Sequence, residues 1–582
     1  MTELISEEDF AKALKLEKVK LNLLAPALMR LLKLDEVNEI YSQTSKLEGA
    51  DFAEKMLERM GVEYEISDAD LANIPKTEPF ILIANHPYGG VDGMILMAIL
   101  AKHRPDIKFL ANFLLNQIEP LKNWIIPVNP FEDVGDKAMN IKGVKEILNH
   151  LKTSPIALFP AGEVSALKLN NFKISDKKWE PSVGKIISKA GLKVIPVYFS
   201  GHNSLAFNLL GLVHPGLRTI KLPSEMFNKS KNKVKLRIGK PIPFKELADL
   251  DQPKLLDFLR AKTYALGATE EQNTKFKLNL KKLARPHKIV NAVPSHLLEK
   301  EIESISSECK LFNYDNFEVY ISDYDKIPFI IHEIGRLREI TFREVGEGTN
   351  RSIDLDDFDK HYKHLFVWDK EAKTIAGSYR IGEGDVLFRK FGIQGFYLNQ
   401  LFRMSKEMYP MVYQSIELGR SFVAPAYQKK PASLMLLWKG INLFIKNQPH
   451  RFKYMIGPVS ISNSFSNLSK DLLVAYIRHN HWDNKISKWI EPKKRFSYTS
   501  KTEGKNLLFQ AHSEDIKRLD NFIGDIEGNQ KLKIPVLVKK YLKLNGKIVS
   551  FNVDPNFNDS LDGFLIVDIE GIPDDAFEMV NR

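Results

Sequence analysis

Short apolar segments that alternate with amphipathic helical patterns restrict the fold of this chain more than any other feature. Among them are Ile81–Ala84, Trp124–Val128, Ile156–Pro160 and Val194–Phe199. Runs of this length are typical of strands, whereas Lys137–Leu151 repeats its apolar residues with helical spacing. Strands that alternate with helices favour packed layers of both. The sequence therefore predicts an α/β domain in the N-terminal half.

The pattern starts afresh near residue 310 and then keeps a different order. The sequence predicts a strand at Phe317–Ile321 and a helix at Ile331–Val345. A hairpin follows at Leu365–Asp369 and Thr374–Ile381, then a central strand at Ser415–Val423 and a helix at Ala432–Lys446. This order resembles the acetyltransferase-like (GNAT) fold. The sequence therefore predicts a second α/β domain with a GNAT-like fold.

A chain of 582 residues is too long for one hydrophobic core, and roughly two to four domains are expected. We place the first domain at residues 1–280 and the second at 309–582. Residues 281–308 between them are charged and contain the stretch RPHKIVNAVPSH. We interpret this segment as the linker.

The charge balance points to an acidic partner. Lys and Arg exceed Asp and Glu by 11, which suits nucleic acid, an anionic membrane surface or an acidic carrier protein. No nucleic-acid module and no long basic run is present, so we expect no nucleic acid and favour the membrane and the carrier. The single cysteine, Cys309, excludes an intramolecular disulfide and a cysteine metal cluster, and we expect no metal.

Two observations bear on location. The N-terminal segment MTELISEEDF is acidic and lacks the apolar core of a signal peptide. Residues 11–40 are amphipathic, and this helix fits either the plane of a bilayer surface or the side of its own domain. We expect a cytoplasmic protein that rests on the membrane periphery.

The stretch ILIANHPYGGVDG at residues 81–93 places His86 and Asp92 at the end of a predicted strand. Loops at strand ends commonly carry chemistry. A His there can act as a general base, and an Asp can orient its ring. The alternative is a solvated loop in which both residues are incidental.

Three segments in order resemble the glycerolipid acyltransferase superfamily over roughly residues 75–245. They are the His86–Asp92 block, Phe159-Pro160-Ala161-Gly162-Glu163-Val164-Ser165, and Val194-Ile195-Pro196-Val197. The family usually has four residues between its His and Asp, whereas this chain has five, as in a hemolysin-like or ornithine-lipid subgroup. The resemblance implies that His86 and Asp92 are catalytic. It implies that Gly162, Glu163 and Ser165 either shape the acceptor pocket or brace the loop.

One departure from that family concerns the acceptor. The family's third block usually contains an Arg, where this chain has Val164. Cationic side chains hold phosphate groups, so their absence argues against a glycerol phosphate acceptor. A neutral lipid hydroxyl fits better. Backbone amides of the turn after Phe159-Pro160 are candidates for stabilising the oxyanion.

The second half resembles the acyl-homoserine-lactone synthases and, more closely, the ornithine N-acyltransferases. The matching positions are Arg338 and Phe342, Asp356 and Asp359, Arg380, and Glu417 and Arg420. The resemblance implies that Glu417 takes the proton of an amine, and that the arginines hold a carboxylate or orient Glu417. Asp356 and Asp359 would bind a cationic amino-acid side chain or pair with the arginines. Scattered ion pairs on an α/β domain are the alternative reading of all these matches.

Together the two halves resemble the bifunctional ornithine-lipid synthase family. The resemblance implies that the C-terminal domain N-acylates ornithine with a 3-hydroxyacyl chain from acyl carrier protein. The N-terminal domain then O-acylates the hydroxyl of the resulting lyso-lipid, and neither step needs a cofactor beyond the acyl-ACP or acyl-CoA donor. Two alternatives stay open: another amino acid such as glycine or lysine, or a non-catalytic, hemolysin-like membrane-associated protein.

Overall fold

The computed structural model describes residues 4, 7–8, 25–112, 115, 117–128, 137–168, 173–204, 206–209, 215–227, 233–269, 286–497, 504–528 and 532–573. The chain forms two compact units. The first comprises Met1–Thr274, Lys501–Ala511 and Gly524–Gln530, and the second comprises Lys275–Ser500, His512–Ile523 and Lys531–Arg582. Each unit therefore takes in segments from separate parts of the sequence.

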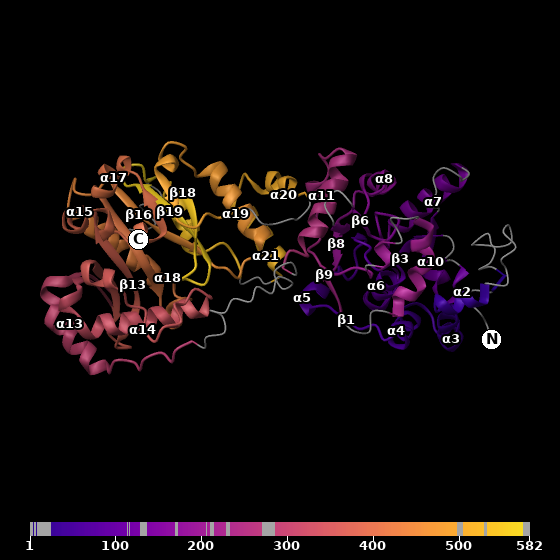
Figure 1. The fold of residues 1–582 in the computed structure, drawn as a ribbon, viewed down its shortest axis with the longest axis horizontal. Coiled ribbons are helices and arrows are strands. Elements are labelled where there is room, and N and C mark those ends of the chain that lie inside the picture. Colours follow the sequence, from indigo (N-terminus) through magenta and orange to yellow (C-terminus); the bar gives the residue numbers. More distant parts are fainter. Residues whose placement is uncertain are drawn as a thin grey trace. The chain divides into compact units, whose positions relative to one another are not determined.

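The first unit is built on a seven-stranded sheet (Figure 1). Its strands, in spatial order, are β1 (Tyr64–Glu65), β9 (Val234–Ile238), β8 (Val194–Phe199), β2 (Ile81–Ala84), β5 (Ile156–Leu158), β3 (Lys108–Asn112) and β4 (Ile125–Val128). β2 pairs in parallel with both β5 and β8 and is fully buried, which explains its uninterrupted apolar sequence. The predicted α/β domain is confirmed.

Helices complete the first unit, together with the small hairpin of β6 (Ala166–Lys168) and β7 (Lys173–Ser175). The helices are α2 (Ala25–Leu31), α3 (Leu34–Thr44), α4 (Gly49–Arg59), α5 (Asp68–Leu71), α6 (Gly90–His103), η4 (Glu119–Trp124), α7 (Lys137–His150), α8 (Pro181–Ala190), α10 (Pro215–Met226), η6 (Phe244–Glu246) and α11 (Gln252–Ala265). α4 and α6 share one core cluster with the buried residues of β2 and β8. Residues 11–24 of the predicted amphipathic helix lie outside the described residues.

The second unit is built on an eight-stranded sheet. Its order is β10 (Lys310–Tyr314), β11 (Phe317–Asp323), β12 (Lys363–Asp369), β13 (Thr374–Glu383), β15 (Ser415–Val423), β16 (Tyr454–Ile461), β19 (Ser560–Asp568) and β18 (Lys547–Asp554). β15 and β16 are its one parallel pair, and they pair only over Ser415–Glu417 and Tyr454–Ile456. Beyond Glu417, β15 keeps its pairing with β13, so an opening between β15 and β16 begins at this residue.

The remaining elements belong to this unit, except for the parts that lie in Lys501–Ala511 and Gly524–Gln530. They are α13 (Ser295–Cys309), η8 (Tyr324–Lys326), α14 (Pro328–Glu344), η9 (Asp357–His361), α15 (Gly384–Phe391), η10 (Gly392–Gly395), α16 (Leu398–Leu401), β14 (Phe402–Met404), η11 (Lys406–Met408), α17 (Tyr409–Tyr413), η12 (Pro425–Tyr427), α18 (Pro431–Lys446), α19 (Asn467–Asn480), η13 (Ile486–Trp489), β17 (Ile490–Pro492), α20 (Lys505–His512), α21 (Ile516–Glu527) and α22 (Val536–Lys543). The strand and helix order predicted for a GNAT-like domain is confirmed.

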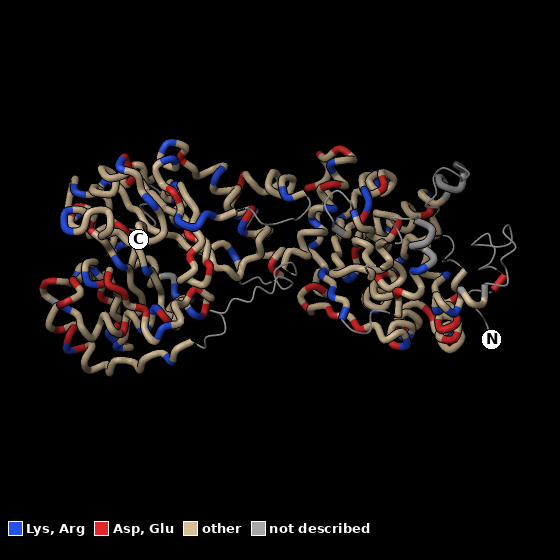
Figure 2. The backbone as a smooth tube through the Cα atoms, in the orientation of Figure 1, with Lys and Arg blue, Asp and Glu red and all other residues tan. Residues whose placement is uncertain are grey.

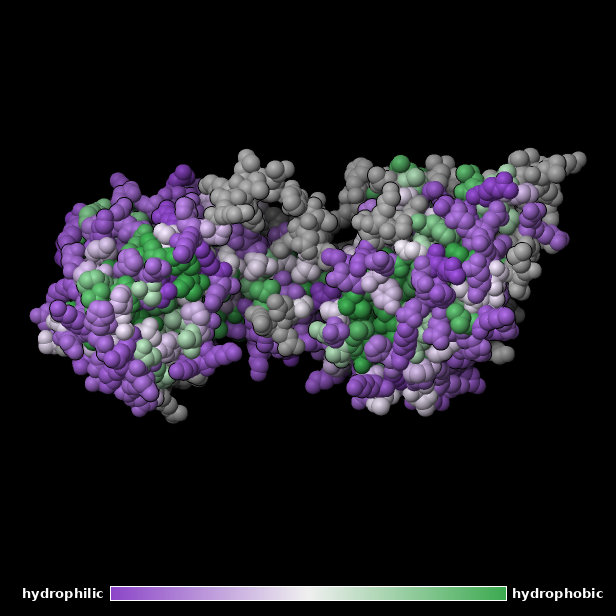
Figure 3. All heavy atoms as spheres, turned by 90° about the horizontal axis from the view of Figure 1, so that it is seen from below, coloured by the Kyte–Doolittle hydropathy of each residue, from purple (hydrophilic) through white to green (hydrophobic). Residues whose placement is uncertain are grey.

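Lys and Arg positions are interspersed with Asp and Glu positions along the backbone of each unit (Figure 2). The face drawn in Figure 3 is mainly hydrophilic, with an apolar area on each unit. Within the described ranges, no helix combines the length and the apolar character that crossing a bilayer requires.

Candidate active sites

The loop after β2 is fixed to the end of the neighbouring strand β8. The amide Nδ2 of Asn85 donates to the carbonyl of Phe199 at 2.9 Å, and the Phe199 N–H donates to Asn85 Oδ1 at 2.7 Å. Tyr88 adds a third tie, since its hydroxyl donates to the carbonyl of Ser200 at 2.7 Å. The loop that carries His86 is therefore held at both ends.

Asp92 lies in the first turn of α6 and holds His86 from inside the domain. Its Oδ2 is 3.0 Å from Nδ1 of His86, and the Asp92 side chain is fully buried. The same oxygen accepts the N–H groups of Tyr88 at 2.9 Å and Gly89 at 3.1 Å. Burial raises the pKa of Asp92, against the lowering effect of His86 and the two N–H groups.

The extra residue between His86 and Asp92 is accommodated at Gly89. This residue has φ +82, a conformation that glycine adopts at little cost. A Cβ atom at Gly89 would lie 3.0 Å from Leu222 Cδ2 and 3.1 Å from Val164 Cγ2. The five-residue spacing thus brings the two side chains together, because the turn is both left-handed and closely packed.

His86 remains accessible while its ring is fixed. The ring stacks on Phe159 with centroids 4.0 Å apart and planes at 27°. The side chain is 17% exposed, whereas Asp92 is not exposed at all. A partly exposed imidazole backed by a buried carboxylate and an aromatic face suits a general base.

A buried carboxylate, Asp176, joins the first and third sequence blocks. Its Oδ1 accepts the His86 N–H at 3.2 Å and the Ser165 hydroxyl at 2.6 Å, and its Oδ2 accepts Trp179 Nε1 at 3.1 Å. The Ser165 N–H in turn donates to the carbonyl of His86 at 2.8 Å. Ser165 therefore braces the loop. Sequence reasoning did not find Asp176, which lies in no recognisable motif.

Gly162 and Glu163 lie at the surface of the same turn. The Gly162 N–H donates to the carbonyl of Phe159 at 3.0 Å, so this amide and that of Ser165 are engaged within the loop. Glu163 is exposed and lies 3.5 Å from Nζ of Lys177. The structure thus brings Ser165 to His86, whereas Gly162 and Glu163 face solvent.

In the second unit, Glu417 lies where β15 and β16 begin to part. It is buried, and both carboxylate oxygens accept hydrogen bonds. Oε1 accepts the Leu398 N–H at 2.7 Å, and Oε2 accepts the Tyr397 N–H at 3.0 Å and the Tyr362 hydroxyl. Burial raises the pKa of Glu417, which opposes the effect of these donors. Glu417 therefore holds the Tyr397–Leu398 segment against the sheet.

The predicted arginines and aspartates form one buried ion-pair network. Arg338 Nη1 lies 2.8 Å from Asp359 Oδ1, and Arg380 Nη1 lies 2.6 Å from Asp356 Oδ1 and 3.4 Å from Asp359 Oδ1. Arg420 Nη2 lies 3.5 Å from Asp356 Oδ2. The arginines hold the pKa of Asp359 well below its usual range, although burial raises it. Both aspartates are thus paired with arginines.

Arg420 departs from the regular strand in which it lies. It has φ +50, and the register between β13 and β15 shifts at this point. Its guanidinium lies 5.0 Å from the ring centre of Tyr397 and 5.2 Å from that of Phe557. Phe342 packs edge-on against Phe557 at 5.5 Å. The bulge thus turns Arg420 out of the sheet and toward the aromatic side chains that follow β18 and η10.

Four acids of the second unit were missed by sequence reasoning: Asp354, whose Oδ2 lies 3.4 Å from Arg420 Nε, and Glu347, Asp554 and Asp562. Burial raises the pKa of Glu347 to about 7 and that of Asp562 to about 8, and Asp554 and Glu347 add to the effect on Asp562. The Ser460 hydroxyl donates to Asp562 at 2.6 Å. Burial raises the pKa of Asp554, against the lowering effect of Arg420. Asp554 and Asp562 lie on the neighbouring strands β18 and β19, whereas Glu347 and Asp354 come from the segment after α14, so no local spacing could have linked the two pairs.

Comparisons with known proteins identify both units. A family model described as an acyltransferase matches residues 11–272, and one described as an acetyltransferase (GNAT) domain matches residues 337–439. The glycine N(alpha)-acyltransferase of Bacteroides thetaiotaomicron is 31% identical over 305 residues, which cover 49% of this chain and 87% of that protein. This chain belongs to the same acyltransferase family. It is therefore an enzyme of acyl transfer, as the sequence predicts.

Two further proteins are similar to parts of this acyltransferase. The lyso-glycine lipid O-acyltransferase of Bacteroides thetaiotaomicron is 29% identical over 224 residues, 37% of this chain and 79% of that protein. The crystal structure of the 1-acyl-sn-glycerophosphate acyltransferase PlsC from Thermotoga maritima is 15% identical, covers 40% of this chain and 80% of that one, and gives a TM-score of 0.25. The N-acyl and O-acyl relatives are separate proteins, and this one chain is similar to both.

Proposed function

We propose that this acyltransferase makes an aminolipid in two steps, N-acylation of an amino acid in the second unit and O-acylation of the product in the first. The observation that carries the proposal is the presence of two acyltransferase units in one chain, similar to an N-acyltransferase and to an O-acyltransferase. The product of the first step would be the substrate of the second.

In the O-acylation step, His86 accepts the proton of the lyso-lipid hydroxyl as the oxygen attacks a thioester carbonyl. The new C–O bond forms, the C–S bond breaks, and the thiol leaves with the proton that His86 returns. Asp92, 3.0 Å from Nδ1, fixes the tautomer with Nε2 as the acceptor and stabilises the imidazolium. Neither the His86 nor the Asp92 role requires a covalent acyl-enzyme.

The acceptor hydroxyl is proposed to lie on the acyl chain rather than on a phosphate ester. Val164 occupies the position of the family's Arg, and its side chain approaches Gly89 beside His86. An apolar side chain at that place provides no charge and no hydrogen-bond donor for a phosphate, and it is compatible with the 3-hydroxyl of an acyl chain. Gly162 and Glu163, at the surface of the same turn, would then form the rim of the acceptor site.

In the N-acylation step, a neutral amine attacks the thioester, so its ammonium proton must first be removed. Glu417 is our candidate for receiving that proton, by way of the Tyr362 hydroxyl that donates to it. The raised pKa of Glu417 makes it a stronger base than an exposed carboxylate. Arg380 and Arg420 lie over the ring of Tyr397 and support it, and Arg338 pairs with Asp359. Arg420 is our candidate for binding the substrate carboxylate.

We propose glycine, rather than ornithine, as the amino acid. The second cation of ornithine would need a free carboxylate, and Asp356 and Asp359 are both paired with arginines. The N-acyl relative is named a glycine N(alpha)-acyltransferase, which also supports glycine. We further propose an acidic acyl carrier protein as donor and the cytoplasmic membrane periphery as location, since the chain has a net charge of +11.

The test is N-acylation by the purified chain, supplied with a 3-hydroxyacyl carrier thioester and equal concentrations of glycine, ornithine, lysine and serine. Mass spectrometry of the lipid extract should show N-acylglycine as the main product. N-acylornithine as the main product would overturn the choice of glycine. No N-acyl product from any of the four would overturn the N-acylation step itself.

A further inference from the structure

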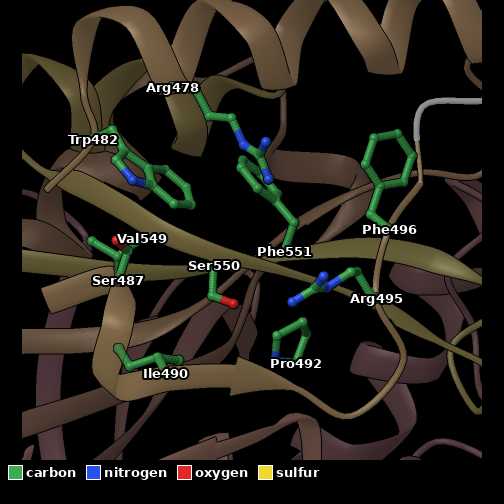
Figure 4. A pocket seen from close by; sticks show the side chains of 10 residues that line it. All are labelled: Arg478, Trp482, Ser487, Ile490, Pro492, Arg495, Phe496, Val549, Ser550 and Phe551. Atoms are coloured by element: carbon green, nitrogen blue, oxygen red, sulfur yellow. The ribbon is translucent and has the colours of Figure 1, made fainter. Parts of the chain in front are cut away.

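A cavity of about 350 Å³ lies in the second unit, at the outer edge of its sheet (Figure 4). β18 forms this edge and is separated from β16 by β19. Neighbouring strands lie roughly 5 Å apart, so the cavity is about two strand spacings from the opening between β15 and β16. The proposed N-acylation site therefore does not include it.

The edge of β18 is covered at both ends and open in the middle. At one end the Ile548 N–H donates to the carbonyl of His481 at 3.0 Å. At the other, the Val553 N–H donates to the carbonyl of Lys494 at 2.9 Å, and the Lys494 N–H donates to Asn552 Oδ1 at 2.8 Å. The cavity lies between these ties, where the register of β18 shifts between Ile548 and Phe551.

The walls of the cavity are apolar and aromatic. Val549 and Phe551 of β18 and Ile490 of β17 line it together with Trp482. The Trp482 and Phe551 rings stack with centroids 6.2 Å apart and planes at 13°. Buried apolar surface of this kind suits the first part of a hydrocarbon chain, and the volume lies at the lower end of ligand sites, roughly 300–1,000 Å³.

Two arginines supply the polar side of the cavity. Arg478 reaches in from the end of α19, and Arg495 reaches in from the segment after β17, with Ser550 and Phe551 between them (Figure 4). Arg478 also lies over the Trp482 ring at 5.1 Å. Among the described residues that line the cavity, none is Asp or Glu. Along the same segment Lys485, Lys488, Lys493 and Glu491 are exposed. The described lining therefore carries a net positive charge.

We propose that this cavity binds an amphiphile with a carboxylate headgroup and an acyl chain, the carboxylate between Arg478 and Arg495 and the start of the chain against Trp482 and Phe551. Guanidinium groups bind carboxylates with paired hydrogen bonds, and the apolar walls reject a small hydrophilic anion. If the proposed function holds, the natural ligand is the N-acyl amino acid, which the second unit would retain at this cavity before its O-acylation.

The site is tested by photoaffinity mapping of the full chain. The probe is an N-acylglycine with a diazirine in the chain near the headgroup, used without any acyl donor so that no turnover is needed. Mass spectrometry should find the label in the peptides around Trp482–Phe496 and Lys547–Asp554. N-dodecanoylglycine should compete for this label, and its methyl ester should not, because the ester lacks the charge.

The double variant Arg478→Gln, Arg495→Gln should lose labelling of these peptides by about tenfold or more, since two charged contacts are removed. Arg389→Gln, which alters an exposed arginine elsewhere in the same unit, should be labelled like the unmodified chain. Equal competition by the methyl ester, unchanged labelling of the double variant, or a label confined to other peptides would overturn the proposal. Because binding is measured without the reaction, failure here leaves the N-acylation test standing.

Discussion

Replacing Asp92 by Asn changes one charge beside His86 and leaves the size of the side chain unchanged. In the structure, Asp92 Oδ2 accepts two backbone N–H groups and lies 3.0 Å from His86 Nδ1. An amide at this position can still accept through its oxygen. The amide can no longer stabilise an imidazolium at His86. Its NH₂ group also places a hydrogen-bond donor in a site where the carboxylate has only acceptors.

The size of the effect follows from these contacts. A positioned general base typically contributes about 10²–10⁴ in rate, and the aspartate that orients it controls most of that contribution. We expect O-acylation of a lyso-lipid to fall by about 10²–10⁴, or roughly 3–5 kcal/mol of activation free energy. Replacing the charged acceptor of the Tyr88 and Gly89 N–H groups by a neutral one should cost about 1 kcal/mol of folding stability.

The assay is O-acylation of a supplied N-(3-hydroxyacyl) amino acid, with product measured by mass spectrometry and folding measured by thermal unfolding. Asp251→Asn is the matched control, because Asp251 caps α11 by accepting the Lys254 N–H at 3.0 Å and touches no site residue. It should keep its stability, because asparagine caps a helix about as well as aspartate, and it should keep its activity. O-acylation by Asp92→Asn within about threefold of the unmodified rate would refute the general-base reasoning.

Three further predictions concern single residues. Gly89→Ala should destabilise the fold by about 1–2 kcal/mol and lower O-acylation, because alanine is strained at φ +82 and meets Leu222 and Val164. Gly93→Ala has open space around it and should change neither stability nor activity. Equal behaviour of the two variants in activity and melting assays would contradict this. Glu417→Gln should destabilise the second unit by about 1–3 kcal/mol and remove N-acylation, while O-acylation of a supplied lyso-lipid stays intact. Loss of both activities in parallel assays would contradict the assignment of the two reactions to separate units. The free energy of unfolding of the second unit should fall as pH rises from about 4 to about 8, because folded Asp562 keeps a proton that the unfolded chain has lost over this window. Urea titrations at several pH values should show a smaller pH dependence for Asp562→Asn. An unchanged pH dependence would exclude Asp562 as its source.

Local patterns allowed the sequence to predict much of the fold. β2 is buried on both faces, so its residues are all apolar, and the helix after it follows directly from the Gly-Gly turn. The His86–Asp92 pair was predictable for the same reason, since both residues belong to one short turn from strand into helix. The left-handed Gly89 explains why an unusual spacing still brings them together.

Contacts between distant segments could not be predicted from the sequence. Asp176 lies 90 residues from His86 and is recognisable only from the hydrogen bonds that it accepts. Asp356 and Asp359 fitted either a substrate cation or arginine partners, and that choice depends on where α14, β13 and β15 place their side chains. The pKa of Asp562 is raised by burial and by Asp554 and Glu347, and Glu347 lies in a distant part of the sequence.

The central claim is that the two units perform successive acylations, and the lipids of a bacterial host given this gene test it most directly. The unmodified chain should yield a di-acylated aminolipid. His86→Ala should yield the mono-acylated lyso-lipid in its place, because only the second step is blocked. Unchanged di-acylated lipid from His86→Ala, or no aminolipid from the unmodified chain, would contradict the account.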